Sequence, residues 1–412
     1  MANFLAELKS TTKVLRPTAT VVRSRGGNIT VERADLLSNL QHTDCMASAK
    51  SAQLLFQQLC TFKISATSTG YLWHYLNEKH HTGWSRVPLA NTSPASLDPS
   101  QPLRALTFNV WFAEHAWKER QDALVHLLFE NSCSSTASTV SSTTGESKAQ
   151  HKPTAQPPLD IVLLQEVTLR FLQRLQQDPR IQQTYSITDS GKGNSFLGKY
   201  GNIVLVHKRL PLPNVVWVKF PGKMGRRGLV VEWENLAIST VHLESLQNAS
   251  TRMAQIQLLC HALPSQAIVA GDFNIAGSGP YANEQENAVF EDLRNNNQLQ
   301  DVSHGLGSTY DTQMNPMVTE VTGQPKDVAR YDRILCRGVE CSNVQLEGTK
   351  AIECSKDQNE HLRISDHFGL SWTILRRKWR QECAPCEYDL QGTFSQNGFK
   401  WPEIEIAGRK LS

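Results

Sequence analysis

The stretch QAIVAGDFNI, residues 266–275, decides how the fold of this chain is interpreted. Residues 267–270 form a continuous apolar run, which is typical of a short buried strand. Directly after the run come Gly271, Asp272 and Asn274, which are residue types that favour turns or polar sites. Side chains two apart on a strand share a face, so Asp272 and Asn274 are predicted to enter one cavity. The stretch therefore predicts a buried strand that ends in polar side chains.

Similar apolar runs recur on both sides of this stretch, between residues 103 and 375. They are LRALTFNVW, LDIVLLQEV, NIVLVHK, GLVVEWE, LAISTVHLE, YDRILCR and FGLSWTIL. Helical patterns fill the gaps, in EHAWKERQDALVHLLF, VTLRFLQRLQQDP, TRMAQIQLLCHAL and NAVFEDLRNNNQL. GLVVEWE is followed directly by LAISTVHLE, which predicts an antiparallel pair. The alternation of strands and helices predicts a mixed α/β sheet protein.

Two low-complexity stretches divide the chain into domains. Residues 88–102 are rich in Pro, Ser and Asn and are predicted to be a linker without stable structure. Residues 131–158 are rich in Ser and Thr and are predicted to be a disordered surface insertion in the main domain, residues 103–375. Residues 1–87 are expected to form a small helical module, and residues 376–412 a C-terminal extension.

Composition limits the classes of protein that the chain can belong to. Hydrophobic residues at 40% and charged residues at 20% of 412 residues describe an ordinary globular protein, and the net charge of +3 predicts no general attraction to polyanions. Nine cysteines without a dense framework favour a reducing compartment. No signal peptide or apolar run long enough to cross a membrane is expected. We expect a monomer, with no membrane contact, in the nucleus or also in the cytoplasm.

Polar side chains with catalytic potential follow the predicted strands at several places. They are Asn109, Glu166, His242, Glu244, Asp272, Asn274, Asp366 and His367. A single Asn or Asp at a strand end is usually a turn residue, and a single His is usually structural. Together, however, they supply oxygen ligands for a hard cation, amide donors, and an imidazole beside a carboxylate. This combination predicts one site for the hydrolysis of a phosphodiester.

The motifs LTFNVWF, LLQEV, VHLES, GDFN, RYDRIL and SDHFGL, in this order, resemble those of the endonuclease/exonuclease/phosphatase superfamily. Within it, TVHLES followed by TRMAQI, STYDTQMNP and RYDRIL most resemble the tyrosyl-DNA phosphodiesterases, which release protein from 5′ ends of DNA. The resemblance covers about residues 103–375. It implies a four-layered α/β sandwich of two mainly antiparallel sheets flanked by helices. It also implies one Mg²⁺, or Mn²⁺ in its place, at the sheet edge.

The resemblance implies which residues hold this metal. Glu166 would be the principal metal-binding carboxylate, and Asp366 would support the metal shell. Asn109 would help to hold the phosphate and the metal shell. Magnesium agrees with this set because it accepts few protein carboxylates and keeps water and phosphate oxygens, whereas zinc prefers several His or Cys ligands.

The resemblance also implies which residues act on the phosphate. Asp272 would orient or deprotonate the attacking water, and Asn274 would donate to the transition state through its amide. His242 and His367 would flank the scissile phosphate. Asp332 would lie behind His367, fix its tautomer and favour the imidazolium form.

Cations near the motifs are candidates for holding a polynucleotide. Arg226 and Arg227 in KMGRRG and Arg252 in STRMAQI are predicted to contact the phosphate backbone, with ordinary surface charge as the alternative. Tyr310 would stack on a terminal nucleotide, as an aromatic residue at this motif does in relatives, although a core-packing role fits equally well.

The predicted function is Mg²⁺-dependent hydrolysis of a 5′-phosphotyrosyl bond left by a trapped topoisomerase, which leaves a 5′-phosphate and serves DNA repair. The predicted partner is a DNA 5′ end that carries a protein adduct, and residues 1–87 would bind a further protein. Two positions depart from the relatives, since Gln247 and Ala276 stand where those carry arginines. The alternatives are another phosphodiesterase of the superfamily, acting on abasic-site DNA, RNA or a phosphoinositide, and a non-catalytic scaffold.

Overall fold

The computed structural model of the chain describes residues 67–69, 71–78, 81–87, 95–130, 158–192, 195, 197–323, 326–352 and 361–375, and four two-residue strands. These are β1 (Val22–Arg23), β2 (Ile29–Thr30), β20 (Glu405–Ile406) and β21 (Arg409–Lys410), which pair as β1–β2 and β20–β21. Within the described residues, no helix is long and apolar enough to span a lipid bilayer.

An eight-stranded sheet forms one of the two central layers. Its strands are β4 (Trp73–Glu78), β5 (His81–Arg86), β6 (Leu103–Asn109), β7 (Ile161–Val167), β8 (Tyr185–Ile187), β9 (Gly201–His207), β18 (Glu340–Glu347) and β19 (Gly369–Leu375). They lie in the order β18-β19-β6-β7-β9-β8-β4-β5. The β6–β7 pair is parallel and the others are antiparallel. All residues of β7 are buried, as expected for a strand covered on both faces.

A seven-stranded sheet forms the other central layer. Its strands are β3 (Thr67–Thr69), β10 (Asn214–Lys219), β11 (Arg227–Trp233), β12 (Leu236–His242), β13 (Ala267–Asp272), β14 (Gln300–Asp301) and β17 (Asp332–Arg337). They lie in the order β14-β17-β13-β12-β11-β10-β3. The β12–β13 pair is parallel, and the predicted antiparallel pair β11–β12 is confirmed.

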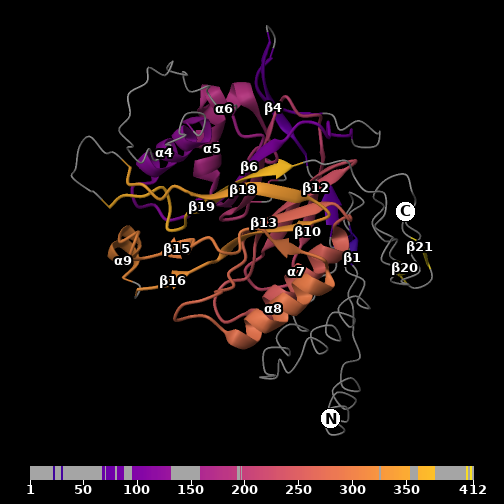
Figure 1. Cartoon of the computed structure of the whole chain (residues 1–412). Helices are drawn as coiled ribbons and strands as arrows, with labels where there is room; N and C mark the ends of the chain where they lie inside the picture. Colours follow the sequence, from indigo (N-terminus) through magenta and orange to yellow (C-terminus); the bar gives the residue numbers. More distant parts are fainter. Residues whose placement is uncertain are drawn as a thin grey trace, which may run out of the picture.

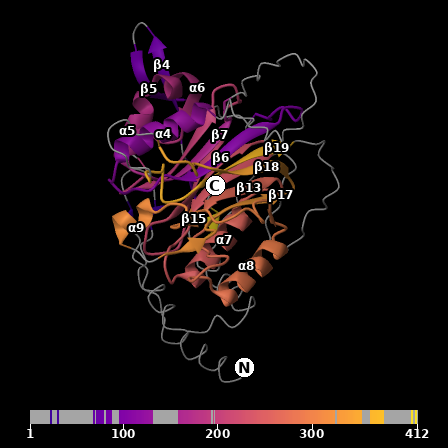
Figure 2. The ribbon, with the colours of Figure 1, turned by 60° about the vertical axis from the view of Figure 1, so that its left-hand side comes forward.

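Helices cover the outer face of each sheet. They are α4 (Trp117–Glu130), α5 (Leu169–Gln177) and α6 (Pro179–Thr184) on one side, and α7 (Ala249–Ala262) and α8 (Glu284–Asn296) on the other. Figures 1 and 2 show these two groups on opposite sides of the sheets. The inner faces of the sheets share one apolar core, and each helical layer packs on a separate one. The predicted sandwich of two mainly antiparallel sheets between helices is confirmed.

Polar caps start two of these helices at defined residues. The Thr168 side chain accepts a hydrogen bond from the Phe171 backbone N–H at the start of α5, and Asn283 accepts one from Glu286 N–H at the start of α8. Such caps satisfy backbone donors that the first turn of a helix leaves without partners. As a result, α5 begins immediately after the end of β7.

The two parallel pairs bring several strand ends to one edge of the sandwich. β6 and β7 end there in one sheet, and β12 and β13 end there in the other. β17 runs antiparallel to β13 and therefore begins at this edge, at Asp332. Gly271 makes the close pairing of β12 and β13 feasible, because a Cβ atom at this position would lie 2.2 Å from the Val241 carbonyl oxygen.

One buried side chain joins the two sheets below this edge. The Gln165 amide donates to Thr107 Oγ1 at 3.0 Å in its own sheet and to Thr240 Oγ1 at 2.8 Å in the other. Beside the edge lie the short strands β15 (Tyr310–Asp311) and β16 (Val328–Ala329) and the helix α9 (Met317–Thr322), which Figure 1 shows together.

Two predicted domain boundaries need correction. Residues 67–86 of the predicted helical module form β3, β4 and β5, which join the two central sheets, so the helical prediction is wrong for them. Within the predicted linker, residues 95–102 have no regular secondary structure, but Leu97 is buried in the core, and its backbone N–H and C=O both bond to the Asn235 side chain. Nearly all of residues 1–66, residues 131–157 and nearly all of 376–412 lie outside the described residues.

Candidate active site

The polar residues predicted from separate motifs meet at the edge where β6, β7, β12, β13 and β17 end or begin. Strand register places His242 beside Asp272, and Asp272 beside Asp332. Asn109 comes from the other sheet, and its Nδ2 donates to Asp272 Oδ2 at 3.0 Å. The two sheets therefore contribute to one site.

Asp272 lies at the centre of the site and is held by amide donors. Its Oδ1 accepts the backbone N–H of Asn274 at 2.8 Å, while Asn109 holds Oδ2. Burial alone would raise the pKa of Asp272, but the neighbouring histidines and these hydrogen bonds outweigh it and lower the pKa below its usual value. Asp272 is therefore an ionised carboxylate with a fixed orientation at neutral pH.

Asn274 and Asn109 have further contacts that fix them. Asn274 has a positive φ of 52°, and its Nδ2 donates to the Leu243 carbonyl at 3.1 Å. Asn109 is buried, and its Oδ1 accepts the Trp111 backbone N–H at 3.0 Å. Asn109 was predicted to lie in the phosphate and metal shell, and in the structure its amide bonds to Asp272 and Trp111.

His242 presents one defined nitrogen to the site. Its Nδ1 lies 2.8 Å from a guanidinium nitrogen of Arg226, which can only donate, so Nδ1 is the acceptor and Nε2 carries the proton. Nε2 lies 3.5 Å from Asp272 Oδ2 and 3.7 Å from Glu166 Oε1. Burial, with help from Arg226, lowers the pKa of His242 to about 3, against the opposing effect of Asp272. His242 is therefore a neutral N–H donor.

His367 differs from His242 because a carboxylate lies behind it. Its Nδ1 lies 2.7 Å from Asp332 Oδ2, as the resemblance implied, and its Nε2 points toward Asp272 Oδ2 at 4.0 Å. Burial would lower the pKa of His367, but Asp332 and Asp366 outweigh burial and raise it well above its usual value. His367 is an imidazolium at neutral pH, so the site combines one neutral and one charged imidazole.

Glu166 occupies a strained position where β7 departs from regular pairing with β9. Its φ is 59°, and the register shifts between Leu164 and Val167. Its Oε2 accepts the Phe112 backbone N–H at 2.9 Å, so the carboxylate is oriented into the site. Burial, together with repulsion from Asp366, raises the pKa of Glu166 to about 7. Strain at a buried carboxylate is a feature of functional positions.

The donors on this side of the site fit a magnesium ion. Glu166 and Asp366 are two oxygen donors that repel each other, and a divalent cation between or beside them would relieve this repulsion. No group of three or more His, Cys, Asp or Glu side chains with metal-binding geometry occurs in the part of the chain that the structure describes. Mg²⁺ does not need one, because it commonly binds one or two carboxylates and completes its shell with water and phosphate oxygens.

The predicted substrate arginines differ in their surroundings. The structure corrects the prediction that Arg252 contacts the substrate. Arg252 is 3% exposed, pairs with Glu286 at 2.6 Å, and donates to the Glu244 and Leu246 carbonyls. It anchors α7 to a loop and does not reach a substrate. Arg226 is buried against His242, whereas Arg227 begins β11 at the edge of the site and is half-buried.

Aromatic rings border the site on two sides, and motif reasoning found only one of them. Tyr310 packs edge-on against His367 with ring centroids 5.3 Å apart, so it borders the site as predicted. On the other side, Phe112 stacks on Tyr200 at 4.7 Å, and Phe112 is 48% exposed. Phe112 is the last residue of the LTFNVWF motif, and this aromatic residue three positions after Asn109 was the signal that could have identified it.

Comparison with known proteins gives the following similarities. The model of the Endonuclease/Exonuclease/phosphatase family matches residues 106–367. No curated protein sequence matches the chain. The chain is similar to the structure of D. rerio TDP2 complexed with single strand DNA product, at 19% identity over 66% of this chain and 99% of that chain, with a TM-score of 0.47. It is also similar to truncated Caenorhabditis elegans TDP2, at 20% identity over 66% and 97% of the two chains, with a TM-score of 0.46.

Proposed function

We propose that this chain, which belongs to the endonuclease/exonuclease/phosphatase family, hydrolyses a phosphodiester at a 5′ end of DNA. Members of this family are typically metal-dependent phosphoesterases. The proposed bond joins the terminal phosphate to a tyrosine of a trapped topoisomerase. Its hydrolysis would leave a 5′-phosphate and a free tyrosine side chain, as required for the repair of such DNA ends.

The observation that carries the proposal is the convergence of two imidazole N–H groups on one carboxylate. Nε2 of His242 and Nε2 of His367 lie 3.5 and 4.0 Å from the same oxygen of Asp272. These separations exceed hydrogen-bond length, so both donors remain available to a ligand. A phosphate between them would bind one neutral donor and one cationic donor, which suits an anion that gains negative charge during reaction.

Each of these residues has a role in the proposed hydrolysis. Asp272, ionised and held by Asn109 and Asn274, orients a water molecule and accepts a proton from it as the water oxygen attacks phosphorus. His242 and His367 donate hydrogen bonds to the phosphate oxygens. The bond between phosphorus and the tyrosine oxygen breaks, and the tyrosine leaves as a phenolate or takes a proton from solvent.

The metal belongs on the Glu166 side of this arrangement. Glu166 and Asp366 would hold Mg²⁺, which when bound supplies positive charge to the phosphate oxygens and the leaving group. Asp332 has no contact with the phosphate in this proposal. Its role is to hold His367 in the charged form and in one orientation.

The choice of a 5′-phosphotyrosyl substrate rests on the motif resemblance, together with two features at the site edge. Tyr310 borders His367, where its ring can stack on the terminal base. Arg227 begins β11 at the same edge and is the remaining candidate for a contact with the DNA backbone. A nuclear location and a protein partner for residues 1–87 belong to this proposal. They would be tested by imaging and by affinity capture with the whole chain and with a chain that lacks residues 1–66, because residues 67–86 contribute strands to the central sheets.

A scaffold without catalysis fits these features less well. Asp272, Asp332 and His367 are all buried, and burying charged groups is costly even when they are paired. The strained backbone of Glu166 adds a further cost. A surface used only for binding has no need of these groups.

Cleavage of an oligonucleotide with a 5′-phosphotyrosine tests the proposal. We expect release of a 5′-phosphorylated strand with Mg²⁺ and none with a chelator, and loss of activity in Asp272→Asn. Abasic-site DNA, RNA and a phosphoinositide should each be cleaved much more slowly than the 5′-phosphotyrosyl oligonucleotide. Preference for one of these three would move the substrate elsewhere in the family, and no turnover of any substrate would favour the scaffold.

A further inference from the structure

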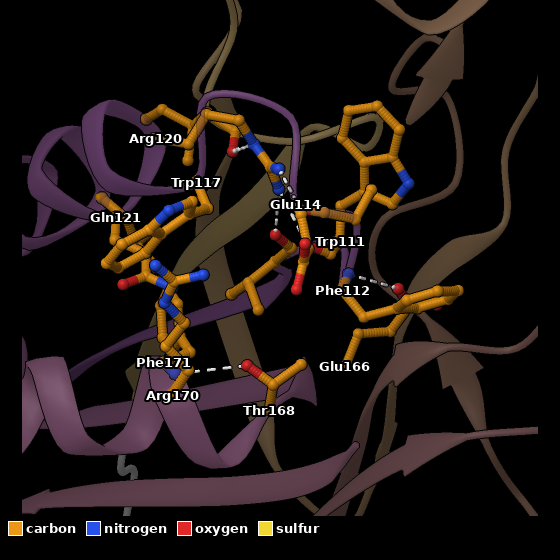
Figure 3. A pocket seen from close by; sticks show the side chains of 14 residues that line it. Trp111, Phe112, Glu114, Trp117, Arg120, Gln121, Glu166, Thr168, Arg170 and Phe171 are labelled. Carbon is orange, nitrogen blue, oxygen red and sulfur yellow. Dashed lines mark hydrogen bonds between the residues drawn. The ribbon is translucent and has the colours of Figure 1, made fainter. Parts of the chain in front are cut away.

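A small pocket opens beside Glu166, and apart from Glu166 the proposed mechanism does not use its lining residues. It has a volume of about 120 Å³ and lies between the loop from β6 to α4 and the first turn of α5. Figure 3 shows Trp117, Gln121 and Arg170 on one side of it and Phe112 and Glu166 on the other. The pocket is therefore continuous with the metal side of the candidate active site.

The loop that forms one wall is held in a fixed shape by a buried arginine. All five N–H donors of Arg120 are used, and they bond to the carbonyls of Val110, Trp111, Ala113, His115 and Ile364. Trp111 and Ala116 in this loop have positive φ angles of 56° and 41°, which are costly for such residues. Arg120 stabilises this conformation, so the pocket exists before any ligand binds.

The lining of the pocket contains a buried amide oxygen without a partner. Gln121 is 7% exposed, and its Oε1 has no hydrogen-bond partner among the described residues. A buried polar atom without a partner costs about 1–3 kcal/mol and is rare in folded proteins. The assignment of oxygen and nitrogen in a glutamine amide can be exchanged, but either atom at this place would need a partner from a water molecule or a ligand.

The upper walls of the pocket are suited to a planar group. The guanidinium of Arg170 lies 3.4 Å from the centre of the Trp117 ring, and no ion pair is found for Arg170 within the described residues. On the opposite wall, Phe112 is already stacked on Tyr200 and keeps an exposed surface. Arginine and aromatic planes of this kind are surfaces on which unpaired nucleobases stack.

We propose that this pocket binds a nucleobase of the substrate strand, from a nucleotide near the scissile phosphate. The base would stack against the Trp117–Arg170 pair, and its edge would bond to the Gln121 amide. This inference rests on the proposed function in that its ligand is single-stranded nucleic acid. It adds a second point of contact besides Tyr310, which does not line the pocket.

The Gln121 amide is the reason for preferring a base over the leaving protein. A tyrosine that is attached to a protein must keep an open path for its chain at the end remote from the phosphate. A base carries donors and acceptors along its edge, and the Gln121 amide in the lining can pair with them. A pocket lined by aromatic planes and an unsatisfied amide therefore fits a base.

Binding of short fluorescent single-stranded oligonucleotides, measured in the presence of a chelator, tests this proposal without turnover. One base at a time is replaced by an abasic unit along the strand. We expect one position at which its loss weakens binding by about fivefold or more, as for the loss of a stacked base. Trp117→Ala and Gln121→Leu should remove this dependence and leave hydrolysis of the base-free substrate bis(4-nitrophenyl) phosphate unchanged.

Gln173→Leu is the matched control, because it makes the same change at an exposed position of α5 that does not line the pocket. It should keep the base dependence. Gln121→Leu should also keep the melting temperature, since it removes an unpaired polar atom at similar volume.

Three results would overturn the inference. The first is equal binding of all abasic strands, and the second is an unchanged base dependence in both pocket variants. The third is that the pocket variants change binding of oligonucleotides according to the length of a 5′ peptide adduct and not according to the missing base. Failure of the proposed function is distinguishable. If phosphotyrosyl DNA is not cleaved while the base dependence and its loss in the variants are seen, the pocket assignment stands and the substrate assignment fails.

Discussion

The two sides of the candidate active site differ in how their charges are balanced. On the phosphate side, formed by Asp272, His242, Asp332 and His367, each ionisable group has a partner that fixes its protonation state. On the metal side, formed by Glu166 and Asp366, two carboxylates repel each other, and the pKa of Glu166 is raised to about 7. The phosphate side is organised by the protein itself, whereas the repulsion on the metal side would be relieved by a bound cation. This difference predicts that changes on the two sides will have different consequences.

The largest effect is expected from Asp272→Asn, which removes the central carboxylate of the phosphate side. Without a base to accept the proton from water, turnover should fall by roughly 10³-fold or more. The asparagine amide would face the donor of Asn109 or of Asn274, so a modest loss of melting temperature is also expected. Steady-state kinetics of phosphodiester cleavage provides the measurement, and near-normal activity of the folded variant would show that Asp272 does not direct the water.

Asp332→Asn should have the next largest effect, because it removes the charge that keeps His367 protonated. Turnover should fall by roughly 10²-fold, and the pH dependence should change. The pKa of His367 is raised in the native protein, so His367 loses its proton only when the pH exceeds this raised pKa. In the variant the pKa should return toward about 6.5, and residual activity should decline above that pH. An unchanged pH profile would contradict this role of Asp332.

A smaller effect is expected from Arg226→Met, with Arg227→Met as the matched control. Loss of the donor to His242 Nδ1 frees the imidazole to adopt either tautomer, so turnover should fall by roughly tenfold. Nitrogen NMR of the histidine ring would report the tautomer directly. Arg227 has no bond to His242, so its variant should weaken substrate binding without altering the tautomer. Equal tautomer populations in wild type and Arg226→Met would be the contradicting result.

The smallest effect is predicted for the metal side, in thermal stability. The folded pKa of Glu166, about 7, lies above its ordinary value of 4.5, so the native state binds more protons than the unfolded state between these values. The contribution of Glu166 to stability therefore falls as the pH rises from about 5 to 7. Added Mg²⁺ should raise the melting temperature by a few degrees at pH 8 and less at pH 5. Glu166→Gln should lose both dependences, and a metal response that survives in this variant would place the ion elsewhere.

Most of the sandwich could be predicted from the sequence, because most of its strands show the same pattern of a continuous apolar run. Most of the strands that were predicted are buried on both faces, so they appear as continuous apolar runs. β18, with the sequence ECSNVQLE, is polar and half-exposed and gave no such signal. The strands β4 and β5 were missed because residues 1–87 were assigned to a separate helical module. Leu97 shows the same limit, because nothing in the sequence around it indicates that its backbone will bond to the side chain of Asn235.

The candidate site was predicted residue by residue, but its internal contacts were not. Motif order was sufficient to group Asn109, Glu166, His242, Asp272 and His367, because the first four lie at the ends of apolar strands and His367 directly precedes one. Arg252 was assigned to the substrate because a cation near a motif looks alike whether it is exposed or buried. Its acceptors, Glu286 and two carbonyls, are set by how α7 and α8 pack. Long-range packing of this kind leaves no local trace in the sequence.

The sequence by itself determined which chemical groups are present, their order along the chain, and the class of fold that carries them. Tertiary structure alone decided their state. His242 and His367 are the same residue type, yet one is neutral because it is buried next to a guanidinium that donates to it, and the other is charged because a carboxylate accepts from it. These partners lie 16 and 35 residues away and are brought close by the register of neighbouring strands and loops. Protonation depends on burial and on nearby charge, and both are properties of the folded chain.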